Sequence, residues 1–137
     1  MSVALTRDIA LCQSLRRRVF TEEQGVSEAD EVDGLDEGAI HFLAEHAGEP
    51  VGTARILLKG KSAKIGRVCV LKEARGTHQG QALINACIEW ARREGLNRAV
   101  LGAQLHALGF YEALGFTAFG PVYDDAGIDH RDMELFL

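Results

Sequence analysis

Two short segments of this chain combine residue types that can bind phosphate and move protons. The first runs from Arg75 to Gly80, where an arginine and two glycines come directly before an amphipathic stretch. The first N–H groups of a helix lack partners within the helix, and the helix dipole favours an anion beside them. An arginine adds a planar fork that matches phosphate oxygens. The segment therefore indicates an anion site, although a loop of this kind is also common as a plain turn.

The second segment runs from Phe110 to Phe116 and contains Tyr111 and Gly115. A tyrosine hydroxyl with an ordinary pKa near 10 is protonated at neutral pH, so it can donate a proton. Taken alone, the same segment is also typical of an apolar helix end that packs in a core and is closed by glycine.

Other site types are excluded by their missing motifs. The chain has no Gly-Lys-Ser/Thr sequence for a P-loop and no G-x-G-x-x-G spacing for a dinucleotide site. Its five histidines show no H-x-x-x-H spacing, and its three cysteines show no C-x-x-C spacing, so no metal site is predicted. The cysteines have apolar neighbours, as reduced thiols in a core do; they are Cys12, Cys69 and Cys87.

Charge is distributed unevenly around a net value of −5. No Lys or Arg occurs between Arg18 and Arg55, where Asp and Glu are frequent, whereas basic residues dominate from Arg55 to Arg75. The acidic balance argues against a nucleic-acid partner. The pattern predicts an acidic part that faces a cationic substrate and a basic part that faces an anionic cofactor, although either run alone is also typical of a solvated surface.

The hydrophobic pattern predicts one mixed α/β domain over residues 1–137. The N-terminus has no signal-peptide pattern, and no apolar run reaches the roughly 18–20 residues of a membrane span, so we expect a soluble cytoplasmic protein without a membrane partner. Residues 25–38 read as a loop or a short irregular helix, and 48–50 as a hairpin turn. Strands are expected near 3–5, 41–45, 51–58, 63–71, 98–101, 116–119 and 133–136, and helices near 8–23, 80–94 and 107–114.

Together and in this order, the two segments closely resemble the motifs of the GNAT superfamily of N-acetyltransferases. Arg75 and Gly80 match the two ends of the cofactor motif of that family, Arg/Gln-x-x-Gly-x-Gly/Ala after a strand. Its second motif, Tyr-x-x-x-Gly-Phe, is matched at 111–116. The segments at 18–26, 31–33 and 127–133 are similar to the short bacterial ElaA-like branch. His78 departs from the family, because it replaces the first loop glycine.

This resemblance implies a GNAT-type acyl-CoA N-acyltransferase fold, a mixed and mostly antiparallel sheet with a splayed parallel pair flanked by helices. It implies acetyl-CoA as acetyl donor, with the pantetheine arm on the strand at 68–70 and the pyrophosphate on the loop at 75–80. Gln104 stands where the family often has an asparagine near the cofactor. The implied cofactor-binding residues are Val68, Cys69, Val70, Arg75, Gly76, Thr77, His78, Gln79, Gly80 and Gln104.

The implied reaction is direct attack of a primary amine, from a small molecule or a peptide, on the thioester. Such an amine has a pKa near 10.4 and must first lose a proton. Tyr111 is the expected acid for the leaving thiol, and a backbone N–H near 68–70 is the expected oxyanion donor. The base stays open among Glu22, Glu23, Glu31, Asp33, His41 and His130. The residues expected to bind the acceptor are Glu23, Glu31, Asp33, His41 and His130.

Two further hypotheses stay open at this stage: a CoA-binding regulatory or partner-binding module with little catalysis, and a structural domain without a ligand. His78 favours the module, and Tyr111 favours the enzyme. We expect His78 to adopt an ordinary backbone conformation with its imidazole pointing outward. Because dimers are common among similar proteins, a homodimer is a further expectation of the resemblance.

Overall fold

The fold is a sheet with one parallel pair among antiparallel strands. The computed structural model describes residues 2–76 and 78–137, and within these residues it has seven strands in the order β1-β2-β3-β4-β5-β7-β6. Only β4 and β5 run parallel in that sheet. The strands are β1 Ser2–Thr6, β2 Ile40–His46, β3 Glu49–Lys59, β4 Ser62–Val70, β5 Arg98–Gln104, β6 Thr117–Asp125 and β7 Ile128–Phe136. The mixed sheet predicted from the sequence is confirmed.

The first helix changes its winding halfway. α1 (Ile9–Arg16) is capped by Asp8, whose side chain accepts the Leu11 N–H at 3.1 Å. It continues as the π-helix η1 (Arg17–Glu23), in which the Gln24 N–H reaches the Val19 carbonyl at 3.0 Å. The sequence predicted one regular helix over this range. The remaining helices are α2 Glu28–Glu31, α3 Gln79–Arg93 and α4 Leu108–Ala113, with 3-10 turns at 36–38, 72–74 and 105–107.

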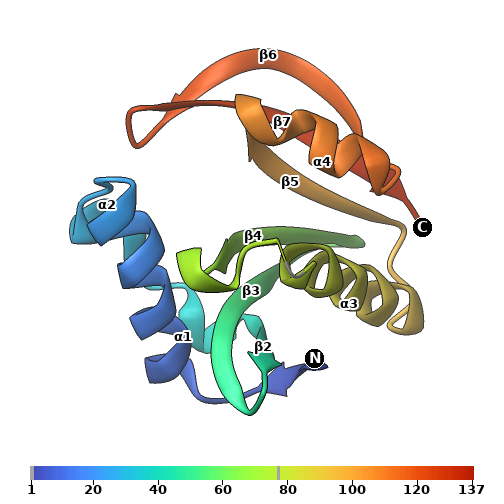
Figure 1. The fold of residues 1–137 in the computed structure, drawn as a ribbon. Helices are drawn as coiled ribbons and strands as arrows, with labels where there is room; N and C mark the ends of the chain where they lie inside the picture. Colours follow the sequence, from blue (N-terminus) through green and yellow to red (C-terminus); the bar gives the residue numbers. More distant parts are fainter. Residues whose placement is uncertain (1, 77) are drawn as a thin grey trace.

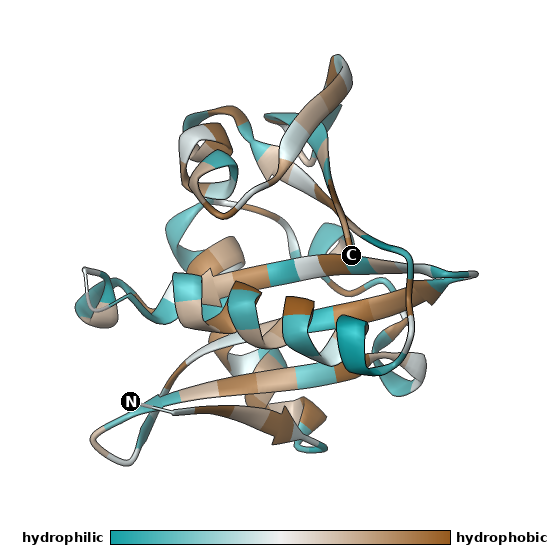
Figure 2. Ribbon diagram, turned by 90° about the vertical axis from the view of Figure 1, so that its right-hand side faces the viewer, coloured by the Kyte–Doolittle hydropathy of each residue, from teal (hydrophilic) through white to brown (hydrophobic). Residues whose placement is uncertain are grey.

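Helices cover both faces of the sheet. The apolar stripe of α3 (Leu83, Ile84, Cys87, Ile88 and Ala91) is buried against strand residues such as Ile56 and Ile65. Leu15 and Val19 form a separate cluster with Cys69 and Leu71. Because neighbouring residues of a strand face opposite sides, α1 and α3 lie on opposite faces. Figure 2 shows α3 with both hydrophilic and hydrophobic turns beside mostly hydrophobic strands. No helix in the described residues is long and apolar enough to cross a membrane.

The parallel pair separates soon after it forms. β4 and β5 are paired only from Ser62↔Arg98 to Lys64↔Val100, although both strands continue further. A register shift between β3 and β4 near Thr53 marks a bulge, and Arg67 in that bulge has φ 50°. Figure 1 shows β4 and β5 close together at one end and opening toward η1, α2 and the start of α3. The splayed pair implied by the resemblance is confirmed.

The last two strands are longer than the sequence predicted. β6 and β7 form a hairpin whose turn, Ala126-Gly127, has φ 54° and 82°. Two positive φ values are typical of the tight turns that join twisted strands. The outer strand β6 is largely exposed, so no buried-face alternation reveals it. The first hairpin also turns at Ala47-Gly48 rather than at 48–50, again with two positive φ values.

A buried network of ion pairs fixes the acidic segment. Arg16, only 1% exposed, contacts Glu31 at 2.6 Å and Asp36 at 2.5 Å. Arg55 pairs with Asp36 at 3.0 Å and with Asp33. Burial alone would raise the pKa of Asp36, but hydrogen bonds from Arg16 and Gln13 outweigh burial and hold that pKa well below its usual value. The sequence predicted that the acidic run faces a cationic substrate or solvent, but these carboxylates are paired with arginines of the protein itself.

We predict that Asp36→Asn destabilises the protein by about 3–5 kcal/mol, because it leaves two buried arginines with one partner fewer. Asp30→Asn is the matched control. Asp30 is exposed and has no ion pair among the described residues, so its loss should change stability by less than about 0.5 kcal/mol. Denaturant unfolding of both variants measures the difference, and equal stability of the two would contradict a structural role for Asp36.

Candidate active site

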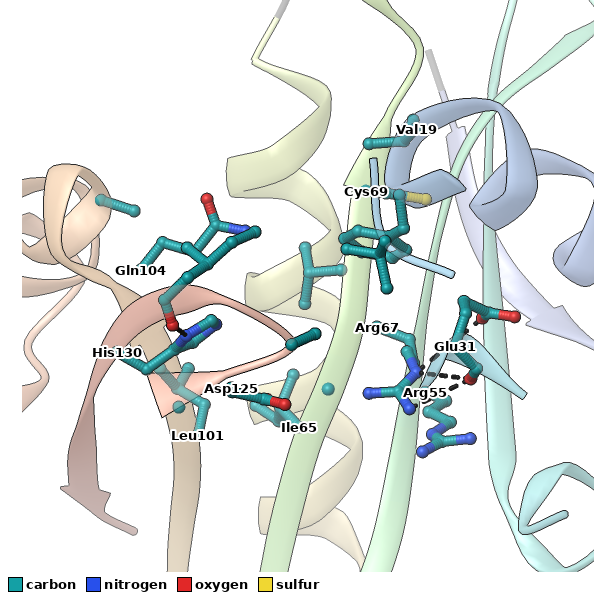
Figure 3. A pocket seen from close by; sticks show the side chains of 18 of the residues that line it. Val19, Glu31, Arg55, Ile65, Arg67, Cys69, Leu101, Gln104, Asp125 and His130 are labelled. Atoms are coloured by element: carbon teal, nitrogen blue, oxygen red, sulfur yellow. Dashed lines mark hydrogen bonds and ion pairs between the residues drawn. The ribbon is translucent and has the colours of Figure 1, made fainter. Parts of the chain in front are cut away.

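The gap between β4 and β5 opens into a cavity of about 560 Å³. Val68, Cys69 and Val70 line it from β4, and Leu101 and Gln104 line it from β5. Figure 3 shows this arrangement: Gln104, His130 and Leu101 lie on one side of β4, and Arg67, Arg55 and Glu31 lie on the other. A cavity of this size can hold the reactive end of a small-molecule substrate.

Alternation along β4 decides which backbone groups face the gap. The Leu71 N–H donates to the Val51 carbonyl of β3 at 2.8 Å, and Thr53↔Cys69 belongs to the same register. The backbone of Val70 and Val68 therefore faces β5 across the gap. The backbone of Cys69 faces β3 instead, which corrects the expectation that all three residues offer their backbone. Burial raises the pKa of the Cys69 thiol to about 12, so this group stays neutral.

The loop before α3 has the predicted position but an unexpected partner for its arginine. The Arg75 guanidinium forms two hydrogen bonds with Glu23, and its Nε donates to the Val70 carbonyl at 3.1 Å. Thr77 lies outside the described residues. Gly76 has φ 87°, and a Cβ at Gly80 would make an ordinary van der Waals contact with the Phe110 ring at 3.6 Å, so the start of α3 lies beside α4.

His78 contradicts our expectation of an ordinary backbone conformation. It is the N-cap of α3, with φ 62° and ψ 21°, which is the left-handed region that glycine adopts most easily. The side chain is exposed. The loop thus has the conformation for which a glycine is suited, although a histidine occupies the position. The following Gln79 is 1% exposed, and its side-chain amide has no partner among the described residues.

Tyr111 and Gln104 both line the cavity. Tyr111 comes from α4 and is held edge-on between Phe110 and Phe116, with ring centroids 5.0 and 6.0 Å away. Burial raises the pKa of its hydroxyl to about 12, so the group is protonated at neutral pH. Gln104 donates to the Gln24 side chain at 3.1 Å, which joins β5 to the segment after η1.

The structure separates the residues predicted to bind the acceptor. Glu31, Asp33 and His130 line the cavity, whereas Glu23 and His41 are not among the residues that line it. His41 is 3% exposed, and its Nε2 contacts the Asp36 carbonyl at 2.7 Å. Its role is therefore structural, which corrects the expectation that it binds substrate. Glu23 pairs with Arg75, as described above.

His130 differs from His41 because it has a free ring nitrogen at the cavity. Its Nδ1 lies 2.7 Å from the Ile128 carbonyl. A carbonyl only accepts hydrogen bonds, so Nδ1 carries the proton and Nε2 of the neutral ring keeps its lone pair. The ring stacks on Tyr123 at 5.9 Å, and the Tyr123 hydroxyl donates to Asp132 at 2.8 Å. Tyr123, which also lines the cavity, was missed because no motif marks a strand tyrosine.

The sequence model of a protein family, the acetyltransferase (GNAT) domain, matches residues 12–137 of the chain. The chain belongs to the GNAT acetyltransferase family. Among its relatives, YyaT of Bacillus subtilis is 38% identical over 126 residues, which are 90% of this chain and 85% of YyaT. ElaA of Escherichia coli is 36% identical over 124 residues, 87% of this chain and 81% of ElaA. These relatives confirm the resemblance inferred from the two motifs.

Solved structures confirm the GNAT fold. The crystal structure of ElaA aligns with a TM-score of 0.84 and 28% identity, covering 97% of this chain and 99% of ElaA. An aminoglycoside 6'-N-acetyltransferase, crystallised with coenzyme A, aligns with a TM-score of 0.78 over 99% of this chain and 97% of its own. At 16% identity, this second likeness concerns the fold alone. Family membership makes the chain a member of the acyltransferases that use acetyl-CoA.

We predict that His78→Gly stabilises this GNAT protein by about 0.5–1 kcal/mol. A non-glycine residue in the left-handed region costs roughly 1–2 kcal/mol, and the greater freedom of an unfolded glycine returns about half of that. Because the loop already has the required backbone conformation, acetyl-CoA affinity should change by less than about tenfold. Thermal unfolding and calorimetric titration measure the two effects. Tightening by a hundredfold would mean that the histidine obstructs the site.

Proposed function

We propose that the protein transfers the acetyl group of acetyl-CoA to a primary amine of a small molecule or peptide by direct attack. The observation that carries this proposal is the open edge of β4 between two proton-transfer groups. The backbone of Val68 and Val70 faces the gap, while Tyr111 and His130 line the same cavity. With a thioester held along this edge, Tyr111 would lie beside the carbon–sulfur bond that breaks, and His130 would lie beside the carbon–nitrogen bond that forms.

The cofactor-binding residues fit this role by the backbone groups that face the gap, of which the Val70 carbonyl already accepts a hydrogen bond from Arg75. An extended ligand arm can pair with an exposed strand edge as another strand would. The N-terminus of α3 supplies unpaired N–H groups for an anion, and Gly76, His78, Gln79 and Gly80 belong to that turn. Gln104 is placed at the far wall of the gap. Acetyl-CoA, when bound there, supplies the activated acetyl group; the protein supplies position and proton transfer.

The two proton-transfer groups come from opposite faces of the sheet. Tyr111 packs against the cluster that includes the α3 stripe. His130 is paired in register with Gln104, which bonds to Gln24 beyond η1, on the α1 face. An amine can therefore approach from the α1 face and lose its proton to His130 Nε2. The leaving sulfur can take the proton of Tyr111 from the α3 face.

A CoA-binding module with little catalysis is the second candidate, and one observation favours it. The Arg75 guanidinium is occupied by Glu23 and the Val70 carbonyl, so it contributes less to a pyrophosphate than a free arginine would. Thiol release from acetyl-CoA in the presence of amines distinguishes the candidates, because a module binds acetyl-CoA but releases no thiol above the uncatalysed rate.

We predict that Tyr111→Phe lowers kcat by about 10²–10⁴-fold and leaves acetyl-CoA affinity within about twofold. The substitution keeps the ring between Phe110 and Phe116 and removes only the hydroxyl. Steady-state thiol release measures the rate, and calorimetry measures the affinity. An unchanged kcat, under conditions where chemistry limits the rate, would rule out Tyr111 as the acid.

We predict that His130→Gln lowers kcat by about 10²-fold or more at neutral pH, with partial recovery at high pH where free amine becomes abundant. His46→Gln is the matched control, since His46 is exposed at the end of β2 and is absent from the cavity lining. A rate loss that does not diminish as pH rises would count against a role for His130 as base.

A further inference from the structure

The charged groups on the acceptor side of the cavity are of two kinds. Some form ion pairs with one another, so that their charges cancel, and the others have no ion pair. Three carboxylates, of Glu31, Asp33 and Asp36, match three guanidinium groups, of Arg16, Arg55 and Arg67. This network is compensated within the protein. The acceptor therefore meets mainly the charges that are not compensated.

Among the described residues, two cations that line the cavity without an ion pair lie on β3 and β4. Lys59 and Lys64 line the cavity, are exposed and have no ion pair within residues 2–76 and 78–137. Arg67, between them and the acidic segment, belongs to the compensated network: it donates through Nε and Nη2 to the Glu31 carbonyl, at 3.3 and 3.1 Å, and through Nη2 to Asp33 at 3.3 Å. Its Nη1 has no partner among the described residues. One face of its guanidinium fork is thus left to a ligand.

An opening lies between these cations. Gly66, on β4 between Lys64 and Arg67, lines the cavity, and a Cβ built on it would meet no atom within 4 Å. Across the strand pair, Gly66 lies opposite Arg55 and Lys64 lies opposite Leu57. The missing side chain leaves space for a small group directly over β4, with a lysine on one side and an arginine on the other.

The other side of the cavity has the opposite character. Asp125, at the β6–β7 turn, lines the cavity and has no ion pair in the described part of the chain. His130 lies on the same hairpin with a ring nitrogen available. Figure 3 shows Asp125 and His130 on one side of β4 and Arg67 on the other. Asp30, which also has no ion pair in the described residues, lies on α2 beside Glu31 and does not belong to this side. The cavity therefore offers a place for a cation near β7 and a place for an anion over β4.

From this division we infer that the acceptor is an amine that also carries an anionic group, a carboxylate or a phosphate. The anionic group lies over Gly66 between Lys64 and Arg67, and the amine lies beside Asp125 and His130. This inference rests on the proposed acetyl transfer and names the substrate class of the same site. It replaces the expectation of a purely cationic acceptor, because the carboxylates that suggested one are already paired with arginines.

The test compares matched acceptors in a thiol-release assay. One pair is an α-amino acid and its primary amide; the other is an aminoalkyl phosphate and the corresponding amino alcohol. We expect kcat/KM to be at least about tenfold higher for one anionic member than for its neutral partner, as is typical for a hydrogen bond to a charged group. The pair that shows the preference identifies carboxylate or phosphate.

Variants locate the effect. Lys64→Gln should lower kcat/KM for the preferred anionic acceptor by about tenfold, leave the neutral partner unchanged and leave KM for acetyl-CoA unchanged. Lys61→Gln, in the same hairpin but absent from the cavity lining, should change neither. Gly66→Val should act like Lys64→Gln by filling the opening, and it needs no backbone strain because φ of Gly66 is not positive.

Two results would overturn the inference while leaving the proposed function intact. One is transfer with no preference for either anionic acceptor. The other is an equal loss with Lys64→Gln and Lys61→Gln. Failure of the proposed function has a different signature, since no amine of either class would then raise thiol release above the background rate.

Discussion

The loss of pairing between β4 and β5 beyond Lys64 and Val100 is the constraint from which the site follows. Inside a folded protein, backbone N–H and C=O groups are almost always paired, so a strand edge that faces an internal cavity demands a partner. The bulge at Arg67 produces this edge, because an extra residue on β4 bends the strand away from its neighbour. The gap then brings residues of β4, β5, α4 and the β6–β7 hairpin to one cavity. No single element carries the site.

The buried ion pairs hold one wall of that cavity. Removing two charges from water is costly, so such a network is weak evidence for stability as such. Its geometry is more informative: Arg16 from α1 and Arg55 from β3 converge on carboxylates of the 28–38 segment, which has few apolar contacts of its own. Arg67 donates to the Glu31 carbonyl from within the bulge. The segment that borders the acceptor and the bulge that opens the gap are therefore fixed by the same interactions.

What the sequence could predict follows from the range of the interactions involved. The stripe of α3, the loop before it and the position of Tyr111 are local patterns, and they were predicted. The partners of Glu31 and Asp33 lie up to 36 residues away along the chain, so the sequence did not reveal their pairing, and the acidic run was predicted to face a cationic substrate. The conformation of His78 was predicted wrongly because a residue type biases φ without fixing it, and here the turn into α3 imposes the left-handed region. Tyr123 and Lys64 have significance only through their neighbours across strands, which a single sequence does not reveal.

Placing the acid and the base on opposite faces of the sheet has a chemical consequence. Both groups line one cavity, but they reach it from different faces, so a thioester bound in the gap would lie between them. With Tyr111 on the α3 face and His130 on the α1 face, the two proton transfers of the proposed reaction occur on separate sides of the bound thioester. The amine gives its proton to His130 on one side, and the leaving sulfur takes a proton from Tyr111 on the other. The high pKa of Tyr111, which burial raises to about 12, fits this separation, since a neutral hydroxyl persists until a thiolate forms beside it. A thiolate is a stronger base than a thioester sulfur, so the hydroxyl donates to the leaving sulfur only as the carbon–sulfur bond breaks. Because a thiol has an ordinary pKa near 8.5, below that of Tyr111, complete proton transfer stays uphill, and the hydroxyl stabilises the developing thiolate mainly as a hydrogen-bond donor.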